Sequence, residues 1–159
     1  MKKKIFLWIL VCSLFPAASA SEDDVLRVEA SIVPKTLSRS QEGKIVLRLH
    51  LQEKLTISPQ PFFIVELRPN EELVLSKDVF TADDLNMETV VEDGEEFLSI
   101  KEPVEIPFAV RLEAASGAHR LEGRVKYFAC SKEEGWWLKS SSRFSVSFST
   151  RRSIFKKKR

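Results

Sequence analysis

Apolar and polar residues alternate along several stretches of this 159-residue chain, and this period of two constrains its fold more than any other feature. The clearest stretches are 26–32, 45–51, 104–112 and 144–148. In the last of them, three apolar residues alternate with serines. Successive side chains of a strand point to opposite faces, so each stretch predicts a strand with one buried and one solvated face.

Further strands are predicted at 62–67, 72–76, 95–100 and 121–129, separated by segments rich in proline, glycine, asparagine and aspartate. Residues 82–87 are predicted to form at most one helical turn, with Thr81 as its cap. Pro107 falls inside a strand and has no N–H to donate, which predicts an edge strand or a bulge. Short strands at this spacing predict an all-β fold, an antiparallel β-sandwich of about seven to nine strands.

The N-terminus predicts export. Three lysines at 2–4 precede an apolar run at 5–15, and Ala18-Ser19-Ala20 has the small-x-small pattern of a cleavage site. The apolar run is shorter than the roughly 20 residues that a membrane-spanning helix needs. We therefore expect a cleaved signal peptide at 1–20 and a periplasmic or secreted protein, whose 139 remaining residues suit one domain.

Charge is unevenly distributed along the expected mature chain. Residues 21–150 carry 16 basic side chains against 23 acidic ones, a net charge of −7. The tail at 151–159 has no acid and six basic residues, namely Arg151, Arg152, Lys156, Lys157, Lys158 and Arg159. This tail suits either contact with an anionic membrane surface or a solubilising end. Nucleic acid is a poor partner for an exported protein.

Cys130 is the one cysteine that remains after the predicted cleavage. It is either a packed small hydrophobe or a thiol that meets a partner's cysteine. The charged residues at 120, 122, 124 and 126 mark the solvent face of the preceding strand, and Cys130 continues that face. The alternation therefore predicts a thiol at the rim of the sandwich. Four aromatic residues nearby complete a candidate partner-binding surface: Tyr127, Phe128, Trp136 and Trp137.

The chain resembles the N-terminal periplasmic domain of the thiol:disulfide interchange protein DsbD family. The features that carry this resemblance are the export signal, the strand order, residues 123–130, the polar loop at 131–135 and the strand at 144–148. The order of elements fits nearly the whole mature chain, and the match of residues is confined to about 123–148. The resemblance implies an immunoglobulin-like sandwich. It also implies a cysteine pair that passes electrons from a membrane-embedded partner to periplasmic thioredoxin-like proteins, and a loop that shields the pair. We expect that loop within 80–97.

This chain departs from the family pattern at the second cysteine. Cys130 matches the first cysteine, but Trp136 stands where the second is expected, and Leu138-Lys139-Ser140 replaces a proline-rich stretch. A dithiol relay resolves its mixed disulfide with the second thiol. The chain is therefore not expected to be an autonomous oxidoreductase. Lys132 favours a lower thiol pKa and the two acids after it favour a higher one, so the sign stays open.

Three functions remain open. The first is a protein-binding or accessory component of periplasmic thiol–disulfide exchange that uses a single cysteine, with a thioredoxin-like or other envelope protein as its partner. The second is a non-redox structural or interaction domain of the cell envelope. The third is a protein-disulfide reductase completed by a partner's cysteine.

No metal site and no cofactor are predicted. His50 and His119 lie on or beside separate predicted strands, and the two histidines and Cys130 lack the spacing of metal ligands. The sequence has no nucleophile elbow and no glycine-rich phosphate loop, and its acidic clusters lack the spacing of a calcium loop.

Overall fold

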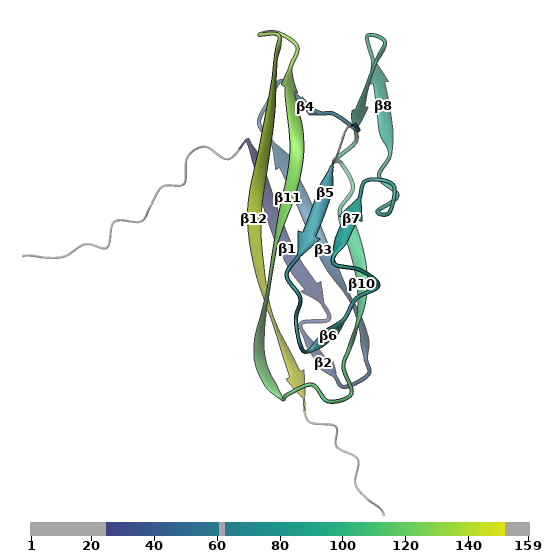
Figure 1. Ribbon diagram of the computed structural model, residues 1–159, viewed down its shortest axis with the longest axis vertical. Coiled ribbons are helices and arrows are strands. Elements are labelled where there is room, and N and C mark those ends of the chain that lie inside the picture. The colour runs from purple at the N-terminus through teal and green to yellow at the C-terminus, as the bar shows by residue number, and fades with distance from the viewer. Residues whose placement is uncertain (1–24, 61–62, 152–159) are drawn as a thin grey trace, which may run out of the picture.

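Two β-sheets packed face to face form the body of the protein, of which a computed structural model describes residues 25–60 and 63–151 (Figure 1). Within those residues the structure is all-β and contains no helix. The strands are β1 (Leu26–Val33), β2 (Thr36–Ser38), β3 (Glu42–Leu51), β4 (Leu55–Ile57), β5 (Ile64–Leu67), β6 (Leu73–Val74), β7 (Val79–Thr81), β8 (Thr89–Glu92), β9 (Glu95–Leu98), β10 (Val104–Val110), β11 (Gly117–Ser131) and β12 (Trp136–Arg151).

The strand order is that of an immunoglobulin-like sandwich. One sheet has the order β1-β3-β10-β6 and the other β2-β12-β11-β5-β7, with β4 also paired to β11. The first order corresponds to the ABED sheet of immunoglobulin domains. The chain crosses from the first sheet to the second between β1 and β2, and β2 then pairs in parallel with β12. The hairpin β8–β9 forms a small third sheet.

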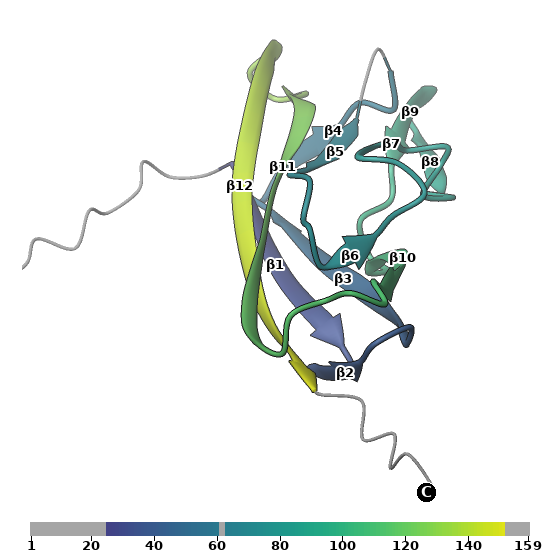
Figure 2. The same ribbon diagram turned by 60° about the horizontal axis from the view of Figure 1, so that its bottom comes forward.

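The long hairpin of β11 and β12 runs the length of the molecule in both views (Figures 1 and 2). At one end it lies beside β4 and extends toward the level of β8, and at the other it reaches β2. Its inward residues pack against those of β1, β3 and β10 in one apolar core. A buried hydrogen bond also joins the sheets, because the Ser142 hydroxyl on β12 donates to the Leu26 carbonyl on β1.

Each predicted strand overlaps a strand of the structure, but the described residues hold twelve strands rather than seven to nine. The additional ones, β2, β4, β7 and β8, have three or four residues each, too few to establish a period. Pro107 does lie at an edge, because β6 pairs only with the last two residues of β10. The predicted signal peptide at 1–20 and the tail from 152 onward lie outside the described residues.

The helical turn expected at 82–87 is an irregular turn instead. The Leu85 N–H donates to the Thr81 carbonyl at 3.2 Å, while the Thr81 hydroxyl and N–H both donate to the Asp84 carboxylate. A hydrogen bond from Lys77, together with those from Thr81, lowers the pKa of Asp84 to about 2. Thr81 therefore caps a turn that does not continue into a helix.

Gly123 allows β11 to pass closely between β5 and the ring of Phe144. A Cβ at this position would lie 2.5 Å from Phe144 Cζ and 2.7 Å from the backbone oxygen of Glu66. The backbone oxygen belongs to a paired strand and has little freedom to move. A side chain at 123 would therefore push both neighbouring strands apart.

We expect Gly123→Ala to lower the free energy of unfolding by about 1–3 kcal/mol, the usual cost of overpacking. Urea denaturation measures this change. Phe144→Leu provides the matched test, because it removes part of the obstruction and should cost less in the Gly123→Ala background than alone. Strict additivity of the two changes would contradict the assigned contact.

Candidate functional site: the covered Cys130 at one end of the sandwich

Cys130 lies near the end of β11, between β4 and β12. Its register partners are Thr56 on β4 and Trp137 on β12. The Thr56 hydroxyl neighbours the thiol, and Trp137 lines the same surface depression of about 310 Å³ as Cys130. The three side chains therefore form a row across one face of the sheet, the face that the alternation predicted for Cys130.

The hairpin β8–β9 covers this face. Asp93 and Glu95, from its turn and its second strand, line the depression together with Cys130. The second strand, β9, also lies against β4. Figure 1 shows β8 and β4 at the same end of the molecule as the tip of the β11–β12 hairpin. The hairpin falls within 80–97 apart from its last residue, so it occupies the segment in which a shielding loop was expected.

Lys132 joins the two hairpins. Its ammonium donates to the Glu92 carbonyl at 3.3 Å and lies 3.7 Å from the Asp93 carboxylate. It also lies 4.4 Å from the centre of the Phe97 ring, within the range of a cation–π interaction. This residue therefore holds β8–β9 close to the strand that carries the thiol.

The predicted position of the thiol at an exposed rim is wrong, because Cys130 is only 5% exposed. Alternation identifies the face to which a side chain points, but a separate element covers that face here. Cys130 and Phe97 are both buried, yet neither belongs to the main core between the sheets. Exposing the thiol therefore requires movement of β8–β9, a hairpin that contributes only Leu98 to that core.

Burial raises the pKa of the Cys130 thiol above its ordinary value, and the nearby Glu95 carboxylate raises it further. The Ser58 backbone N–H and the Thr56 hydroxyl oppose this change, since both stabilise the thiolate by hydrogen bonding. Among the described residues, Thr56 Oγ1 is the buried side-chain oxygen that has no hydrogen-bond partner, and it lies beside the thiol. The net shift of the pKa is upward, which disfavours the thiolate, the reactive form of cysteine.

The four aromatic residues predicted to surround the thiol do not form one surface. Tyr127 is fully buried, because it points between the sheets, and its hydroxyl lies 3.4 Å from Ser142 Oγ. Its predicted place on a contact surface is therefore wrong. Trp136 packs partly against the core, and its indole N–H donates to Glu134. Phe128 is partly exposed, and Trp137 is 65% exposed.

Sequence analysis missed several residues that define this site. Thr56, Glu95 and Phe97 are distant from Cys130 in the chain, and only the pairing of β4 with β11 and the position of β8–β9 bring them close. Leu138 was also missed, although it is 43% exposed beside Trp137. In the sequence, the one available signal for this surface was the pair of consecutive apolar residues Trp137 and Leu138 shortly after the polar loop at 131–135.

The basic tail leaves the opposite end of the molecule. Arg151 is exposed at the end of β12 and pairs with Ser38 of β2, far from Cys130 (Figure 1). Arg152, Lys156, Lys157, Lys158 and Arg159 lie outside the described residues. Contact of the tail with a membrane stays a prediction.

Residues 25–60 and 63–151 contain no group of three potential metal ligands and no helix long and apolar enough to cross a membrane. The two histidines have separate neighbours: His50 lies 3.4 Å from a Glu29 carboxylate oxygen, and His119 Nε2 lies 2.8 Å from Thr150 Oγ1.

No protein-family model and no curated protein matches the sequence. Several solved structures are similar in fold. A cohesin module of a family 33 glycoside hydrolase from Clostridium perfringens matches with a TM-score of 0.48 and 9% identity, over 80% of this chain and 98% of that one. The N-terminal periplasmic domain of ScsB from Proteus mirabilis matches with a TM-score of 0.39 and 11% identity, over 78% and 45%. AggA, the major subunit of aggregative adherence fimbriae type I from Escherichia coli, matches with a TM-score of 0.38 and 10% identity, over 80% and 97%.

Removing the Phe97 side chain is expected to uncover Cys130. We predict that a disulfide reagent labels the native protein slowly and that Phe97→Ala accelerates labelling by about tenfold or more, since about 1.4 kcal/mol of local stability changes the open population tenfold. The rate should rise with pH around a midpoint above the ordinary thiol pKa, because deprotonation is disfavoured.

Val91→Ala on the same hairpin is the matched control, because Val91 is 68% exposed and its truncation removes little packing. Its labelling rate should equal that of the wild type. Equal rates for Phe97→Ala and the wild type would show that the hairpin does not cover the thiol.

Proposed function

We propose that this protein is an exported protein-binding module and that it binds its partner through the end formed by the hairpins β11–β12 and β8–β9. The observation that carries the proposal is the distribution of exposed apolar side chains. Four large ones lie on these two hairpins: Val90, Val91, Trp137 and Leu138. Exposed apolar side chains gathered at one end favour a contact surface, and tryptophan is the residue most often dominant in such contacts.

Trp137→Ala is expected to weaken binding to a thioredoxin-like envelope protein by about tenfold or more, which corresponds to about 1.4 kcal/mol. Calorimetric titration with a purified protein of this class measures the change. Leu112→Ser is the matched control, because Leu112 is also 65% exposed but follows β10, on neither hairpin. Equal binding by the wild type and Trp137→Ala would contradict the assigned surface.

A role in thiol–disulfide exchange is the second proposal, and the burial of Cys130 beneath one hairpin, outside the main core, favours it. Docking on the two hairpins would displace β8–β9 and expose the sulfur. The Cys130 thiolate would then attack the partner's disulfide, forming a mixed disulfide while the partner's second sulfur leaves as a thiolate. A single cysteine cannot resolve this bond, so the partner's released thiolate or another thiol must do so.

The test uses an oxidised thioredoxin-like protein. We expect a mixed disulfide on non-reducing electrophoresis that is absent for Cys130→Ser and forms faster for Phe97→Ala, in which the cover is weakened. Cys130→Ser should keep its non-covalent binding. If Phe97→Ala reacts with a small thiol reagent but forms no mixed disulfide, the exchange proposal is wrong and the binding proposal stands.

A further inference from the structure

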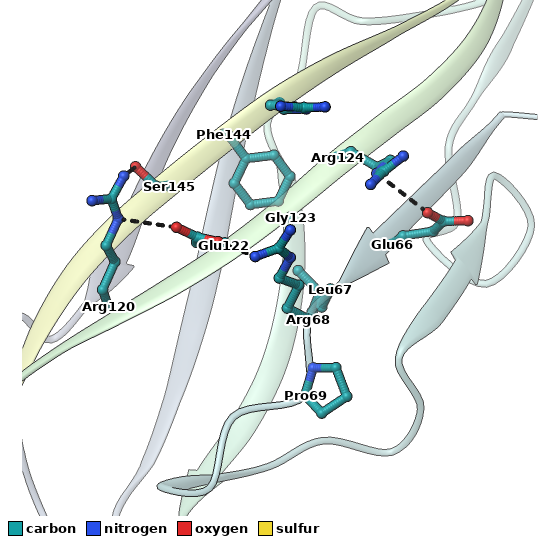
Figure 3. A pocket seen from close by; sticks show the side chains of 11 residues that line it. Glu66, Leu67, Arg68, Pro69, Arg120, Glu122, Gly123, Arg124, Phe144 and Ser145 are labelled. Atoms are coloured by element: carbon teal, nitrogen blue, oxygen red, sulfur yellow. Dashed lines mark hydrogen bonds and ion pairs between the residues drawn. The ribbon is translucent and has the colours of Figure 1, made fainter.

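A second depression, of about 410 Å³, lies on the sheet formed by β5, β11 and β12, well away from Cys130. It surrounds the point where the Phe144 ring meets Gly123 (Figure 3). Its volume falls in the usual range of small-molecule sites. Cys130 lies seven positions after Gly123 on β11, a distance of roughly 23 Å at the rise of a strand.

The depression carries more positive than negative charge. Four arginines from three segments of the chain line it: Arg68, Arg120, Arg124 and Arg143. The two glutamates among its lining residues, Glu66 and Glu122, are each shared between two cations. Figure 3 shows Arg68, Arg120 and Arg124 around the Phe144 ring, with Glu122 between Arg120 and Arg68 and with Glu66 beyond Arg124.

Glu122 accepts a hydrogen bond from Arg68 at 2.8 Å and lies 3.5 Å from Arg120. Glu66 lies 3.6 Å from Arg124 and also pairs with Lys126. Both carboxylates are thus fully engaged. They leave no acid in the depression for a further cation.

Arg143 is the arginine of the depression that has no carboxylate to pair with. It lies directly opposite Arg124 in the pairing of β11 with β12, so two guanidinium groups occupy neighbouring cross-strand positions. Among the described residues, its side chain makes no hydrogen bond and no ion pair. Like charges at such positions destabilise a sheet. The packing of the core does not require this pair, because both side chains project from the outer face of the sheet.

We propose that this depression binds a phosphate or sulfate group, held between Arg124 and Arg143. Guanidinium groups bind such oxyanions with two parallel hydrogen bonds, and an anion between them turns a repulsive pair into an attractive one. The apolar floor at Phe144 and the neighbouring Pro69 suit the organic body of a phosphate or sulfate ester. This site is independent of the function proposed above, because it shares no residue with the end that carries Cys130.

The test is a nuclear magnetic resonance titration of the protein with inorganic phosphate, inorganic sulfate and glycerol phosphate, each at constant ionic strength. We expect saturable amide shifts confined to 66–69, 120–124 and 143–145. Tighter binding of glycerol phosphate than of inorganic phosphate would identify esters as the ligand class, and equal binding would identify the free anion. Shifts that rise linearly without saturation, or that spread over the whole surface, would overturn the proposal.

Variants separate binding from folding. Arg143→Gln should weaken phosphate binding about tenfold, the usual effect of losing a charge-assisted hydrogen bond. Arg143→Glu should abolish binding with a Tm at or above that of the wild type, because the introduced carboxylate faces Arg124. Glu122→Gln should strengthen binding, since it removes a competing carboxylate.

Arg48→Gln is the matched control, because Arg48 is an exposed arginine on β3 of the other sheet. Its phosphate affinity should equal that of the wild type. An equal loss of affinity in Arg48→Gln and Arg143→Gln would show that binding is nonspecific and would overturn the proposal.

Discussion

The unbroken pairing of β11 with β12 is the constraint on which the rest of the structure depends. All fifteen residues of β11 have a partner on β12. One regular register therefore fixes which side chains face inward over the whole length of the molecule. It sets Tyr127 and Ser142 in the core, Arg124 against Arg143 on the outer face, and Cys130 beside Trp137 near the tip. A slip of one residue would exchange the two faces and place arginines between the sheets.

The burial of Cys130 follows from a different kind of interaction. The hairpin β8–β9 contributes only Leu98 to the main core, and the four residues of β8 are all exposed. The hairpin is held at this end by Lys132 and by its position against β4. Elements with few buried contacts open at lower free energy than the core does. We therefore expect access to the thiol to depend on local opening of this hairpin and not on global unfolding.

The sequence predicted those features that depend on a single strand. Ile45, Leu47 and Leu49 alternate with neighbours that are exposed or only partly buried, and all three are buried as expected. The face of β11 to which Cys130 belongs was also predicted correctly. Features that depend on two or more segments could not be read in this way. The cover over Cys130 requires the position of a hairpin more than thirty residues earlier in the chain.

The arginine pair shows the same limit. Arg124 and Arg143 are nineteen residues apart in the chain, and nothing in the local sequence around either one points to the other. Their opposition depends on the length of the turn at 132–135, which sets the register for every later pair. Tyr127 illustrates the converse error, because the charged residues at 120, 122, 124 and 126 mark the opposite face of its strand. Proximity to Cys130 in the sequence outweighed that pattern.

The two ends of β12 have different chemistry, so the two ends of the molecule present different surfaces. Trp137 and Arg151 are separated by fourteen residues of one strand, which is roughly 46 Å at the usual rise per residue. The exposed apolar residues and the covered thiol therefore lie at one end, and the start of the basic tail lies at the other. If the tail contacts an anionic surface, the end with Cys130 projects away from that surface. Such an arrangement would present the thiol to a soluble partner and would separate it from thiols within the membrane.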